Sequence, residues 1–324
     1  MPHVVCLRPV HPEALALLRA APGVTVEVLD PVNAETIAAA MPKADAVIVR
    51  ATPINREFLS HAPNLRIVAR HGVGYDAVDV PALTERGIPL TVTPDANAAC
   101  VAEHAMMLML NVARQTQFYD AAVRGMRWSN PPVPATFDLG GKTVLVMGFG
   151  RIGGRVARLC KAFDMKVLVR DPFIPQNTIK GAGFIPAKDL QAALAEADVV
   201  TLHLPSSEKT RGIVNGEFLA SMKQGAVLIN TARGTLVDET ALAGALTSGH
   251  LKAAGLDVFW EEPAVASNPL LKLPNVVMTP HSAAATEQGL RRMALSCADS
   301  ILSVFANTLD PDAVINQEVL RGNA

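Results

Sequence analysis

The sequence predicts an α/β chain built from two doubly wound parallel sheets. Short apolar runs rich in β-branched residues alternate with helix-forming segments along the whole chain, which is the pattern of parallel sheets covered by helices on both faces. The 324 residues suffice for two domains, each with its own core. Half of the residues are hydrophobic and 18% are charged, which is typical of a globular protein.

The expected strands fall into two series. The first series makes one small wound sheet and comprises Val4–Leu7, Val24–Val28, Ala46–Val49, Ile67–Ala69 and Ile88–Thr91. The second series has the six-strand pattern of a nucleotide-binding domain and comprises Thr143–Val146, Lys166–Val169, Val199–Leu202, Ala226–Ile229, Ala253–Leu256 and Val276–Met278. No low-complexity linker separates the series, and we expect hinges at Thr93-Pro94 and Thr279-Pro280.

The second domain is predicted to be an insertion in the first. The chain beyond Pro280, with a helix expected over Thr286–Phe305, cannot extend the second sheet, so we expect it to return to the first domain. The predicted domains are residues 1–100 with 284–324, and residues 101–283. The segment Val101–Arg114 is apolar almost all round, which indicates a helix buried on several sides or in a subunit interface. The arm that follows, which includes Pro131-Pro132-Val133-Pro134, is expected either to connect the elements or to make dimer contacts.

Composition and charge exclude several kinds of partner. The formal net charge of −1, with no cluster of Lys and Arg, gives no electrostatic footprint for nucleic acid. The four cysteines, Cys6, Cys100, Cys160 and Cys297, lack the spacing of metal ligands, so we expect neither a metal site nor a disulfide framework. No apolar run reaches the length of a membrane span, and residues 1–7 have the pattern of a strand and not of a signal peptide. We therefore expect a cytoplasmic protein.

A glycine-rich turn follows the first strand of the second series. The apolar run 144–147 leads into Gly148-Phe149-Gly150-Arg151-Ile152-Gly153, and helix-forming sequence comes next. Gly148 would permit the tight turn, Gly150 the close approach of a pyrophosphate, and Gly153 the packing of the helix on its strand. The N–H groups at the start of that helix would bind the anion. Such turns also occur for packing reasons alone, but this context favours a dinucleotide site.

Asp171 is the predicted ligand of the adenosine ribose. It ends the apolar run Lys166–Arg170, 23 residues after Gly148, near the offset expected for a ribose-binding acid. A carboxylate there accepts hydrogen bonds from both hydroxyls and repels a 2′-phosphate, since like charges about 4 Å apart cost roughly 4 kcal/mol at an effective dielectric near 20. Asp171 therefore favours NAD over NADP. Two alternatives stay open: Arg170 could turn inward and pair with a 2′-phosphate, and Asp171 could belong to an ordinary Asp-Pro turn.

Three later segments carry polar side chains at the carboxyl ends of expected strands, where a wound sheet binds its ligand. Arg233 could clamp a carboxylate with two charge-assisted hydrogen bonds, or be a surface arginine at a turn. Glu261 and Glu262 lie just beyond another strand. His281 follows the last strand, where the alternative is a structural, hydrogen-bonded histidine.

On these residues the whole chain resembles the D-isomer-specific 2-hydroxyacid dehydrogenase family, in particular its 3-phosphoglycerate dehydrogenase-like branch. Six motifs carry the resemblance, and their shared order makes it highly specific. They are the substrate loop Ala69–Asp76, the interdomain helix Val101–His104, the cofactor turn Gly148–Gly153, the arginine motif Asn230–Gly234, the acid motif Asp257–Pro263 and the histidine motif Thr279–His281. The resemblance implies a flavodoxin-like split substrate domain with an inserted Rossmann NAD-binding domain.

The resemblance also implies an NAD-dependent oxidoreductase that acts on a 2-hydroxy acid, or on a 2-oxo acid in reverse. His281 would be the general base and acid, a role that suits imidazole because it titrates near neutral pH. Glu262, the acid directly before a proline, would hold that ring. Arg233 would bind the substrate carboxylate and polarise the carbonyl. No metal is needed for this reaction.

The same matching implies which residues bind cofactor and substrate. The implied cofactor contacts are Gly148, Gly150, Arg151, Ile152, Gly153, Asp171, Thr231, Arg233, Asp257 and His281, with Val73 as a further one. The implied substrate contacts are Arg50, Arg70, His71, Val73, Gly74 and Arg233. Among these, the backbone N–H groups of Val73 and Gly74 would meet the substrate carboxylate.

Departures from the family pattern leave the substrate, its stereochemistry and the physiological direction open. Arg50 and Arg70 match basic positions that could hold a phosphate, but Ala51 replaces a common serine, Val73 replaces a common threonine, and Ser129-Asn130-Pro131 lacks basic residues. We therefore expect Arg50, Arg70 or His71 to meet another polar or anionic group of the substrate.

Other functions on the same fold are alternatives to this interpretation. One is 3-phosphoglycerate dehydrogenase proper, and another is a non-catalytic, NAD-sensing corepressor-like protein. Oxidation of formate or phosphite is a third. The formate branch is disfavoured because it resembles this pattern with glutamine where Glu262 stands.

Overall fold

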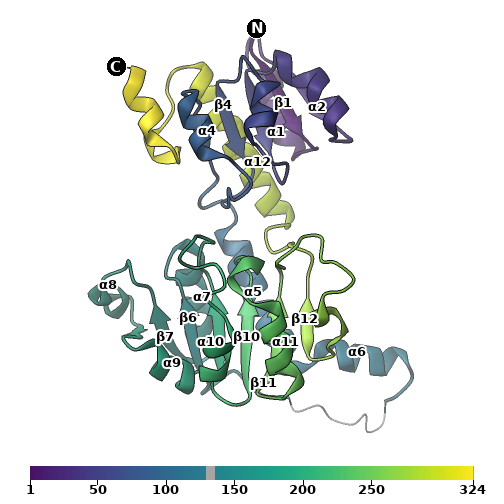
Figure 1. Ribbon diagram of the computed structural model, residues 1–324, viewed down its shortest axis with the longest axis vertical. Coiled ribbons are helices and arrows are strands. Elements are labelled where there is room, and N and C mark those ends of the chain that lie inside the picture. The colour runs from purple at the N-terminus through teal and green to yellow at the C-terminus, as the bar shows by residue number, and fades with distance from the viewer. Residues whose placement is uncertain (129–135, 324) are drawn as a thin grey trace. The chain divides into compact units, whose positions relative to one another are not determined.

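The structure is a computed structural model that describes residues 1–128 and 136–323 (Figure 1). The chain folds into two compact units. The split unit comprises Met1–Asn97 and Ala284–Ala324, and the inserted unit comprises Ala98–Ala283. The segments Ser129-Asn130-Pro131 and Pro131-Pro132-Val133-Pro134, which the sequence singles out, lie outside the described residues.

The split unit is built on a parallel sheet that has five strands within the described residues, in the order β2-β1-β3-β4-β5. The strands are β1 (His3–Leu7), β2 (Thr25–Leu29), β3 (Ala46–Val49), β4 (Ile67–Arg70) and β5 (Leu90–Thr91). Each strand of the first predicted series is confirmed, with small differences at the ends. The chain runs from β1 outward to β2, then crosses back to β3, so the strand order reverses between β1 and β3.

Alternate side chains of β1 explain how both faces of this sheet are covered. Val4 and Cys6 pack with α1 and α12 on one face, while Val5 and Leu7 pack with α2, α3 and α4 on the other. This is the two-sided burial that makes strands of parallel sheets apolar throughout. The helices are α1 (Pro12–Ala20), α2 (Ala34–Ala40), α3 (Arg56–Ser60), α4 (Val80–Glu85) and α12 (Glu287–Phe305).

The C-terminal segment closes one edge of the split unit's sheet. Thr91 of β5 forms an antiparallel bridge with Val314, and the N–H of Ile315 donates to the Leu90 oxygen at 2.9 Å. The Asn316 side chain, 1% exposed, accepts from the Leu90 N–H at 2.8 Å and donates to the Ile88 oxygen at 2.9 Å. These bonds satisfy backbone groups that an open edge strand would expose.

The inserted unit is a second parallel sheet, with seven strands among the residues that the structure describes, in the order β12-β11-β10-β9-β6-β7-β8. The strands are β6 (Thr143–Met147), β7 (Lys166–Arg170), β8 (Ile185–Pro186), β9 (Val199–Leu202), β10 (Ala226–Asn230), β11 (Leu251–Leu256) and β12 (Val276–Met278). The sequence predicted six strands for this unit, which was wrong because it missed β8. This two-residue strand pairs only with β7 at the sheet edge, where a proline is tolerated, and is too short to give an alternating pattern.

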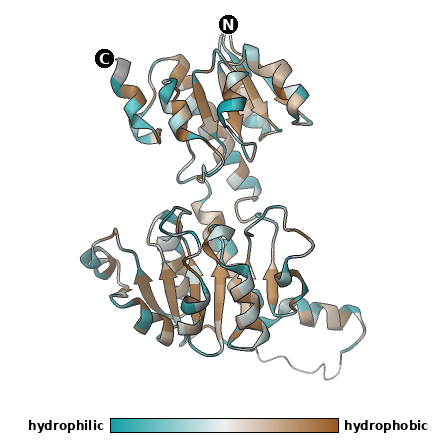
Figure 2. Ribbon diagram, viewed as in Figure 1, coloured by the Kyte–Doolittle hydropathy of each residue, from teal (hydrophilic) through white to brown (hydrophobic). Residues whose placement is uncertain are grey.

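Two helical layers cover the inserted sheet. Val144 and Val146 of β6 pack with α5 and α7, whereas Leu145 and Met147 pack with α9, α10 and α11. The helices are α5 (Ala98–Arg114), α6 (Thr116–Arg124), α7 (Arg151–Ala162), α8 (Gln176–Gly181), α9 (Leu190–Glu196), α10 (Gly216–Ser221) and α11 (Glu239–Thr247). The apolar helix predicted over 101–114 is confirmed as α5, which is buried on several sides. Figure 2 shows the hydrophobic strands of both sheets in brown.

The remaining expectations concern cysteines, metals and membranes. The four cysteines are buried thiols outside any disulfide, as expected of core residues. Within residues 1–128 and 136–323, no group of three or more His, Cys, Asp and Glu side chains could hold a metal ion. No helix in the described part of the chain is long and apolar enough to cross a membrane.

Replacing Asn316 tests the edge closure. Asn316→Ala would leave the Leu90 N–H and the Ile88 oxygen buried without partners, so we expect the free energy of unfolding to fall by about 1–3 kcal/mol. The matched control is Gln317→Ala, which removes an exposed amide and should change stability by less than about 0.5 kcal/mol. Urea unfolding of both variants measures this, and equal stabilities would contradict the edge-closing role.

Candidate active site

The glycine turn between β6 and α7 is shaped for close packing on one side and for a ligand on the other. Gly148 has a φ of +95°, and a Cβ there would overlap the backbone oxygen of His203. A Cβ at Gly153 would overlap the oxygen of Gly148. At Gly150, by contrast, no described heavy atom lies within 4 Å of a Cβ. Two glycines are therefore required by packing, and the middle one leaves space that a pyrophosphate can enter.

The start of α7 adds an electrostatic reason for anion binding here. Gly150 is the N-cap of this helix and no described side chain caps it, so the first N–H groups stay available. The partial positive charge of the helix N-terminus then favours an anionic group in the space beside Gly150. The residues of this turn thus fit the diphosphate of a dinucleotide.

Asp171 lies where β7 ends, directly beside the glycine turn. Its two carboxylate oxygens accept the N–H groups of Phe149 at 2.8 Å and Phe173 at 2.9 Å. Because an ionised carboxylate has about four acceptor positions, the half-buried Asp171 still has capacity for two ribose hydroxyls. Arg170 donates instead to the backbone oxygens of Ala187 at 3.2 Å and Lys188 at 3.1 Å, so its guanidinium is held on the β8 side of the strand.

The loop after β10 carries Arg233 and is held by a buried amide. The Asn230 side chain, 1% exposed, donates to the Arg233 oxygen at 2.8 Å and accepts from the Ala232 N–H at 3.0 Å. A Cβ at Gly234 would overlap the backbone of Phe259, so this loop packs closely on the segment after β11. Within the described residues, the buried hydroxyl of Thr231 has no hydrogen-bond partner, which fits a ligand contact at this edge of the sheet.

Asp257 organises the segment that follows β12. Its side chain has almost no exposed surface, and its carboxylate accepts from the Thr279 hydroxyl at 2.6 Å, the Ser282 N–H at 2.8 Å and the Ala283 N–H at 2.9 Å. The cofactor contact of Asp257 that the resemblance implies stays a prediction. Asp257 fixes the backbone on both sides of His281.

A histidine on α5 joins this buried group. The Nε2 atom of His104 lies 2.8 Å from the Thr279 hydroxyl and 3.4 Å from the Asp257 carboxylate. Burial lowers the pKa of His104, while the nearby Asp257 carboxylate opposes that shift. Helix α5 is thereby tied to the histidine motif through side chains of the inserted unit alone.

His281 and Glu262 form the central pair of the site. The His281 Nδ1 atom lies 2.5 Å from a Glu262 oxygen, and the other Glu262 oxygen accepts the Phe259 N–H at 3.0 Å. The His281 backbone has a φ of 51°, and its N–H donates to the backbone oxygen of Asp257 at 2.7 Å. A carboxylate partner keeps the proton on Nδ1, which leaves Nε2 as the acceptor. No described residue hydrogen-bonds Nε2, and the side chain is half exposed.

The charge of Glu262 is stabilised from three directions. Burial of this carboxyl opposes its ionisation, but the hydrogen bonds from His281 and the Phe259 N–H and the nearby charges of His281 and Arg233 outweigh that effect. Together they hold the pKa of Glu262 below its usual range. Glu262 is therefore an anion at neutral pH, suited to orient and stabilise an imidazolium.

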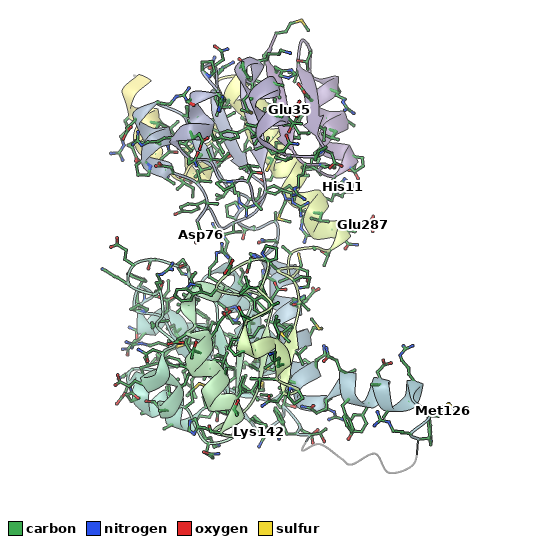
Figure 3. The ribbon with its side chains drawn as sticks, turned by 45° about the vertical axis from the view of Figure 1, so that its right-hand side comes forward. His11, Glu35, Asp76, Met126, Lys142 and Glu287 are labelled. Atoms are coloured by element: carbon green, nitrogen blue, oxygen red, sulfur yellow. The ribbon has the colours of Figure 1, made fainter. Side chains whose placement is uncertain are left out.

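The predicted substrate residues of the split unit gather at the carboxyl ends of β3 and β4. Arg50 is exposed, while Arg70 is half-buried and donates to the His71 oxygen. His71 is only 5% exposed, and burial together with the charges of Arg50 and Arg70 lowers its pKa to about 4. Val73 and Gly74 are half-buried in the loop that ends at Asp76, which Figure 3 labels. Two guanidinium groups, from the ends of two neighbouring strands, therefore act on a neutral histidine at this edge of the sheet.

Sequence reasoning missed the residues that hold the site together. His104, Asn230 and Thr279 lie within the quoted motifs, but they had no assigned role, because each acts through hydrogen bonds that only the folded chain shows. His203 was also missed, although it follows a predicted strand. Its backbone lies against the glycine turn, one ring nitrogen contacts the Thr201 hydroxyl at 2.9 Å, and burial lowers its pKa to about 3.

A protein-family model matches the inserted unit. Residues 106–283 match the model described as "D-isomer specific 2-hydroxyacid dehydrogenase, NAD binding domain". This range covers most of the inserted unit, including the glycine turn, Asp171 and the Arg233, Glu262 and His281 segments.

Known proteins resemble the chain over almost its whole length. The D-3-phosphoglycerate dehydrogenase of Mycobacterium tuberculosis is 41% identical over 98% of this chain, which spans 61% of that relative's length. The glyoxylate reductase of Aeropyrum pernix is 38% identical over 99% of this chain and 97% of its own. The chain thus spans less than two thirds of that phosphoglycerate dehydrogenase but nearly all of the glyoxylate reductase.

Solved structures agree with these relatives. The TT0316 protein of Thermus thermophilus is 36% identical, with a TM-score of 0.87 over 97% of this chain and 99% of that one. A D-lactate dehydrogenase of Aquifex aeolicus, solved with NAD and lactic acid, is 27% identical, with a TM-score of 0.86 over 97% and 99% of the two chains. Motifs, fold and relatives therefore lead to one conclusion: the chain belongs to the D-isomer-specific 2-hydroxyacid dehydrogenase family.

Proposed function

We propose that the protein is an NAD-dependent oxidoreductase that interconverts a 2-hydroxy acid and the corresponding 2-oxo acid. The observation that carries this proposal is the contact of 2.5 Å between His281 Nδ1 and the Glu262 carboxylate, with Arg233 close enough to stabilise the same carboxylate. A histidine with a bonded Nδ1 and an open Nε2 is arranged to move a proton, and the neighbouring arginine is arranged to bind an acid.

Each residue has a defined part in this reaction. When bound, NAD supplies the acceptor for the hydride that leaves C2 of the hydroxy acid. His281 takes the hydroxyl proton at Nε2 and returns it in the opposite direction. Glu262 keeps the ring oriented and stabilises the imidazolium. Arg233 binds the carboxylate and stabilises the developing carbonyl oxygen. In all, the hydroxy acid loses one hydride from C2 and one proton from its hydroxyl group.

The inserted unit supplies the residues proposed to hold NAD. The glycine turn with Arg151 and Ile152 at the start of α7 would bind the diphosphate, and Asp171 would bind the adenosine ribose. The unpartnered hydroxyl of Thr231 supports a further contact. NAD is favoured over NADP because Asp171 is acidic and the Arg170 guanidinium is held by backbone oxygens.

The split unit supplies the residues proposed to select the substrate. The N–H groups of Val73 and Gly74 would meet its carboxylate. Arg50 and Arg70 would meet a second polar or anionic group, beside the buried His71 ring. The two positive charges favour a substrate that is more anionic than a simple monocarboxylate.

A homodimer and a cytoplasmic location are proposals as well. A homodimer through the inserted unit is supported by exposed apolar side chains at and after α6, namely Val123, Met126 and Trp128. Figure 3 shows Met126 next to the end of that helix. The expected interface comprises the helix Val101–Arg114 and the arm after it, within residues 101–140, and part of that arm lies outside the described residues. Sedimentation velocity tests the dimer, and the cytoplasmic location stays a prediction.

Removing His281 tests the reaction. We expect His281→Ala to lower kcat by about two to four decades with any 2-hydroxy acid that the protein oxidises. The measurement is NADH formation over a panel of 2-hydroxy acids, with both enantiomers of each. If the unaltered protein bound NAD tightly but turned over none of these acids, the result would contradict the proposal and favour a binding protein.

The fall in kcat for oxidation at low pH, the acid limb of the pH profile, should depend on Glu262. In Glu262→Gln the imidazolium loses a neighbouring negative charge, so the fall in kcat upon acidification moves to lower pH. Glu262 itself does not set this limb, because its pKa is held below the usual range. Glu261→Gln, which changes an exposed neighbour, should leave the pH profile unaltered. Equal profiles for the two variants would exclude the proposed pairing.

Asp171 should decide between NAD and NADP. Asp171→Asn keeps an acceptor for a backbone N–H but removes the charge, so the ratio of kcat/KM for NADP to that for NAD should rise by about two to three decades. Arg170→Ala should leave this ratio unchanged, because its guanidinium is bound to Ala187 and Lys188. A large change in the Arg170 variant alone would reverse the assignment.

Arg50 and Arg70 should matter only for substrates with a second anionic group. For the best such acid, we expect Arg50→Ala and Arg70→Ala each to lower kcat/KM about 10- to 100-fold, while glycolate oxidation changes little. Arg66→Ala is the control on the same unit. An unchanged kcat/KM for the best anionic substrate in both variants would refute this selectivity.

A further inference from the structure

The split unit contains a cavity of about 470 Å³ at the carboxyl edge of its sheet. Arg8, directly after β1, and Ala51 and Thr52, shortly after β3, form part of its wall. These are the two strands between which the strand order reverses. In open α/β sheets, the crevice at such a reversal, outside the carboxyl ends of the strands, is where ligands bind. The cavity therefore lies at a position where a wound sheet can bind a ligand.

The backbone at Arg8 has a conformation that is rare for a residue with a side chain. Arg8 has a φ of 101°, in a region that glycine adopts readily and side-chain-bearing residues rarely do. Its N–H donates to the Cys6 oxygen at 3.0 Å, so the chain turns sharply as soon as β1 ends. Glycine would relieve the strain, yet an arginine stands here, at the wall of the cavity. Strain of this kind, once observed, points to a role for the side chain.

The cavity brings together charges that the described residues do not satisfy. Arg8 and Glu57 both line it and are exposed, and no described residue forms a hydrogen bond or ion pair with either side chain. The Thr52 hydroxyl and the His61 ring are likewise without a described partner. The two amides in the lining are different, because Asn33 and Asn55 cap short helices through their side-chain oxygens.

The lining also includes apolar side chains, namely Val32, Ile37, Pro53 and Phe58. A ligand that fits has a carboxylate for Arg8, a hydrogen-bond donor for Glu57 and a short apolar body. A guanidinium pairs well with a planar carboxylate, and a hydroxyl or ammonium group would donate to Glu57. We propose that this cavity is a second, non-catalytic binding site for a small 2-hydroxy or 2-amino carboxylate.

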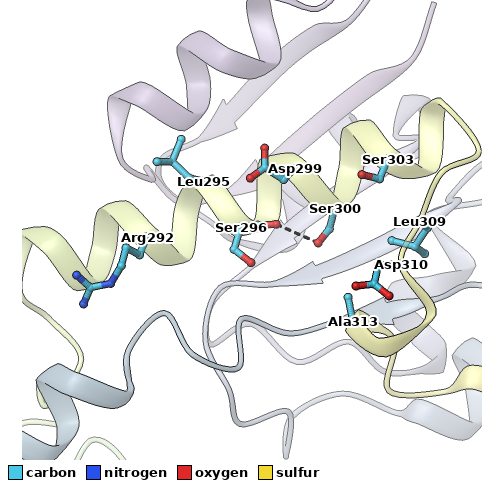
Figure 4. Close-up of a pocket in the computed structure, with 9 residues that line it drawn as sticks. All are labelled: Arg292, Leu295, Ser296, Asp299, Ser300, Ser303, Leu309, Asp310 and Ala313. Carbon is cyan, nitrogen blue, oxygen red and sulfur yellow. Dashed lines mark hydrogen bonds between the residues drawn. The ribbon is translucent and has the colours of Figure 1, made fainter.

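A groove of about 360 Å³ along α12, which Figure 4 shows, has one cationic side chain in its lining, and that side chain, Arg292, donates to the Ala96 oxygen at 2.8 Å. There the Ser300 hydroxyl already donates to the Ser296 oxygen at 2.9 Å, and the Asp310 carboxylate accepts the Asp312 N–H at 3.0 Å. These polar groups of the groove are thus used within the fold, in contrast to those at Arg8.

The test separates this site from the proposed active site. Full-length Arg233→Ala protein, without added NAD, removes the guanidinium proposed to bind substrate acids. Isothermal titration with lactate, alanine and propionate then measures binding that does not involve Arg233. We expect saturable binding of lactate or alanine, and at least about tenfold weaker binding of propionate, which has no donor for Glu57. This result does not depend on whether the protein oxidises any acid.

Adding Arg8→Ala to that variant should weaken binding of the better ligand about tenfold or more. Arg19→Ala, which removes an exposed arginine of the same unit, is the matched control and should change nothing. Unchanged affinity after Arg8→Ala, equal affinity for propionate, or no saturable binding to Arg233→Ala protein would each overturn the proposal.

Two further variants probe the proposed ligand contacts of Arg8 and Glu57 separately. Arg8→Lys retains the charge but not the fork of the guanidinium, and should bind with intermediate affinity if the protein folds normally. Glu57→Gln distinguishes the two ligand sources, because a neutral amide still accepts from a hydroxyl but loses the charge that attracts an ammonium group. Alanine binding should therefore suffer more than lactate binding in that variant.

Arg8→Gly separates strain from binding. Glycine accepts the positive φ, so this variant should melt at a higher temperature than the parent while losing the ligand. A higher melting temperature with ligand affinity intact would show that the strained arginine does not serve the cavity, and would refute the proposal.

Discussion

The buried carboxylate of Asp257 is the constraint on which the candidate active site depends. It lies at the end of β11 and accepts hydrogen bonds from residues on both sides of His281. A buried charge is tolerated only when its acceptor positions are filled, so these bonds also fix the backbone that supplies them. His281 can therefore keep a φ of 51°, which an isolated loop would not hold.

Most of the fold could be predicted because buried parallel strands are apolar on both faces. Runs such as Ala46–Val49 and Val199–Leu202 have ends that match the structure, since they are short, β-branched and followed by polar turns. The edges were harder. Ile185–Pro186 has one neighbour and hardly any pattern, and the pairing of β5 with the C-terminal segment depends on the Asn316 amide, which no periodicity reveals.

The site could be predicted in the residues that would touch ligands, and hardly at all in the residues that support them. Glycine spacing and an acid at the right offset have direct chemical meaning, as do Arg233, Glu262 and His281. Asn230 and His104 act by hydrogen bonds to residues distant in sequence or to a neighbouring loop, so only the folded chain shows them. Asp257 was singled out by the resemblance, but its bonds to Thr279, Ser282 and Ala283 are visible only in the folded chain.

The interrupted sequence of the split unit has a consequence for biosynthesis. Its helix α12 and its edge-closing segment emerge from the ribosome only after residues 98–283 have been made. Until then, β5 has an open edge and one face of the sheet lacks α12, so apolar surface stays uncovered while the inserted unit, which is continuous in sequence, folds first. Residues 284–323 thus complete a sheet whose strands are synthesised before the inserted unit, and until these residues emerge the sheet has an edge and a face at which a nascent chain can associate wrongly.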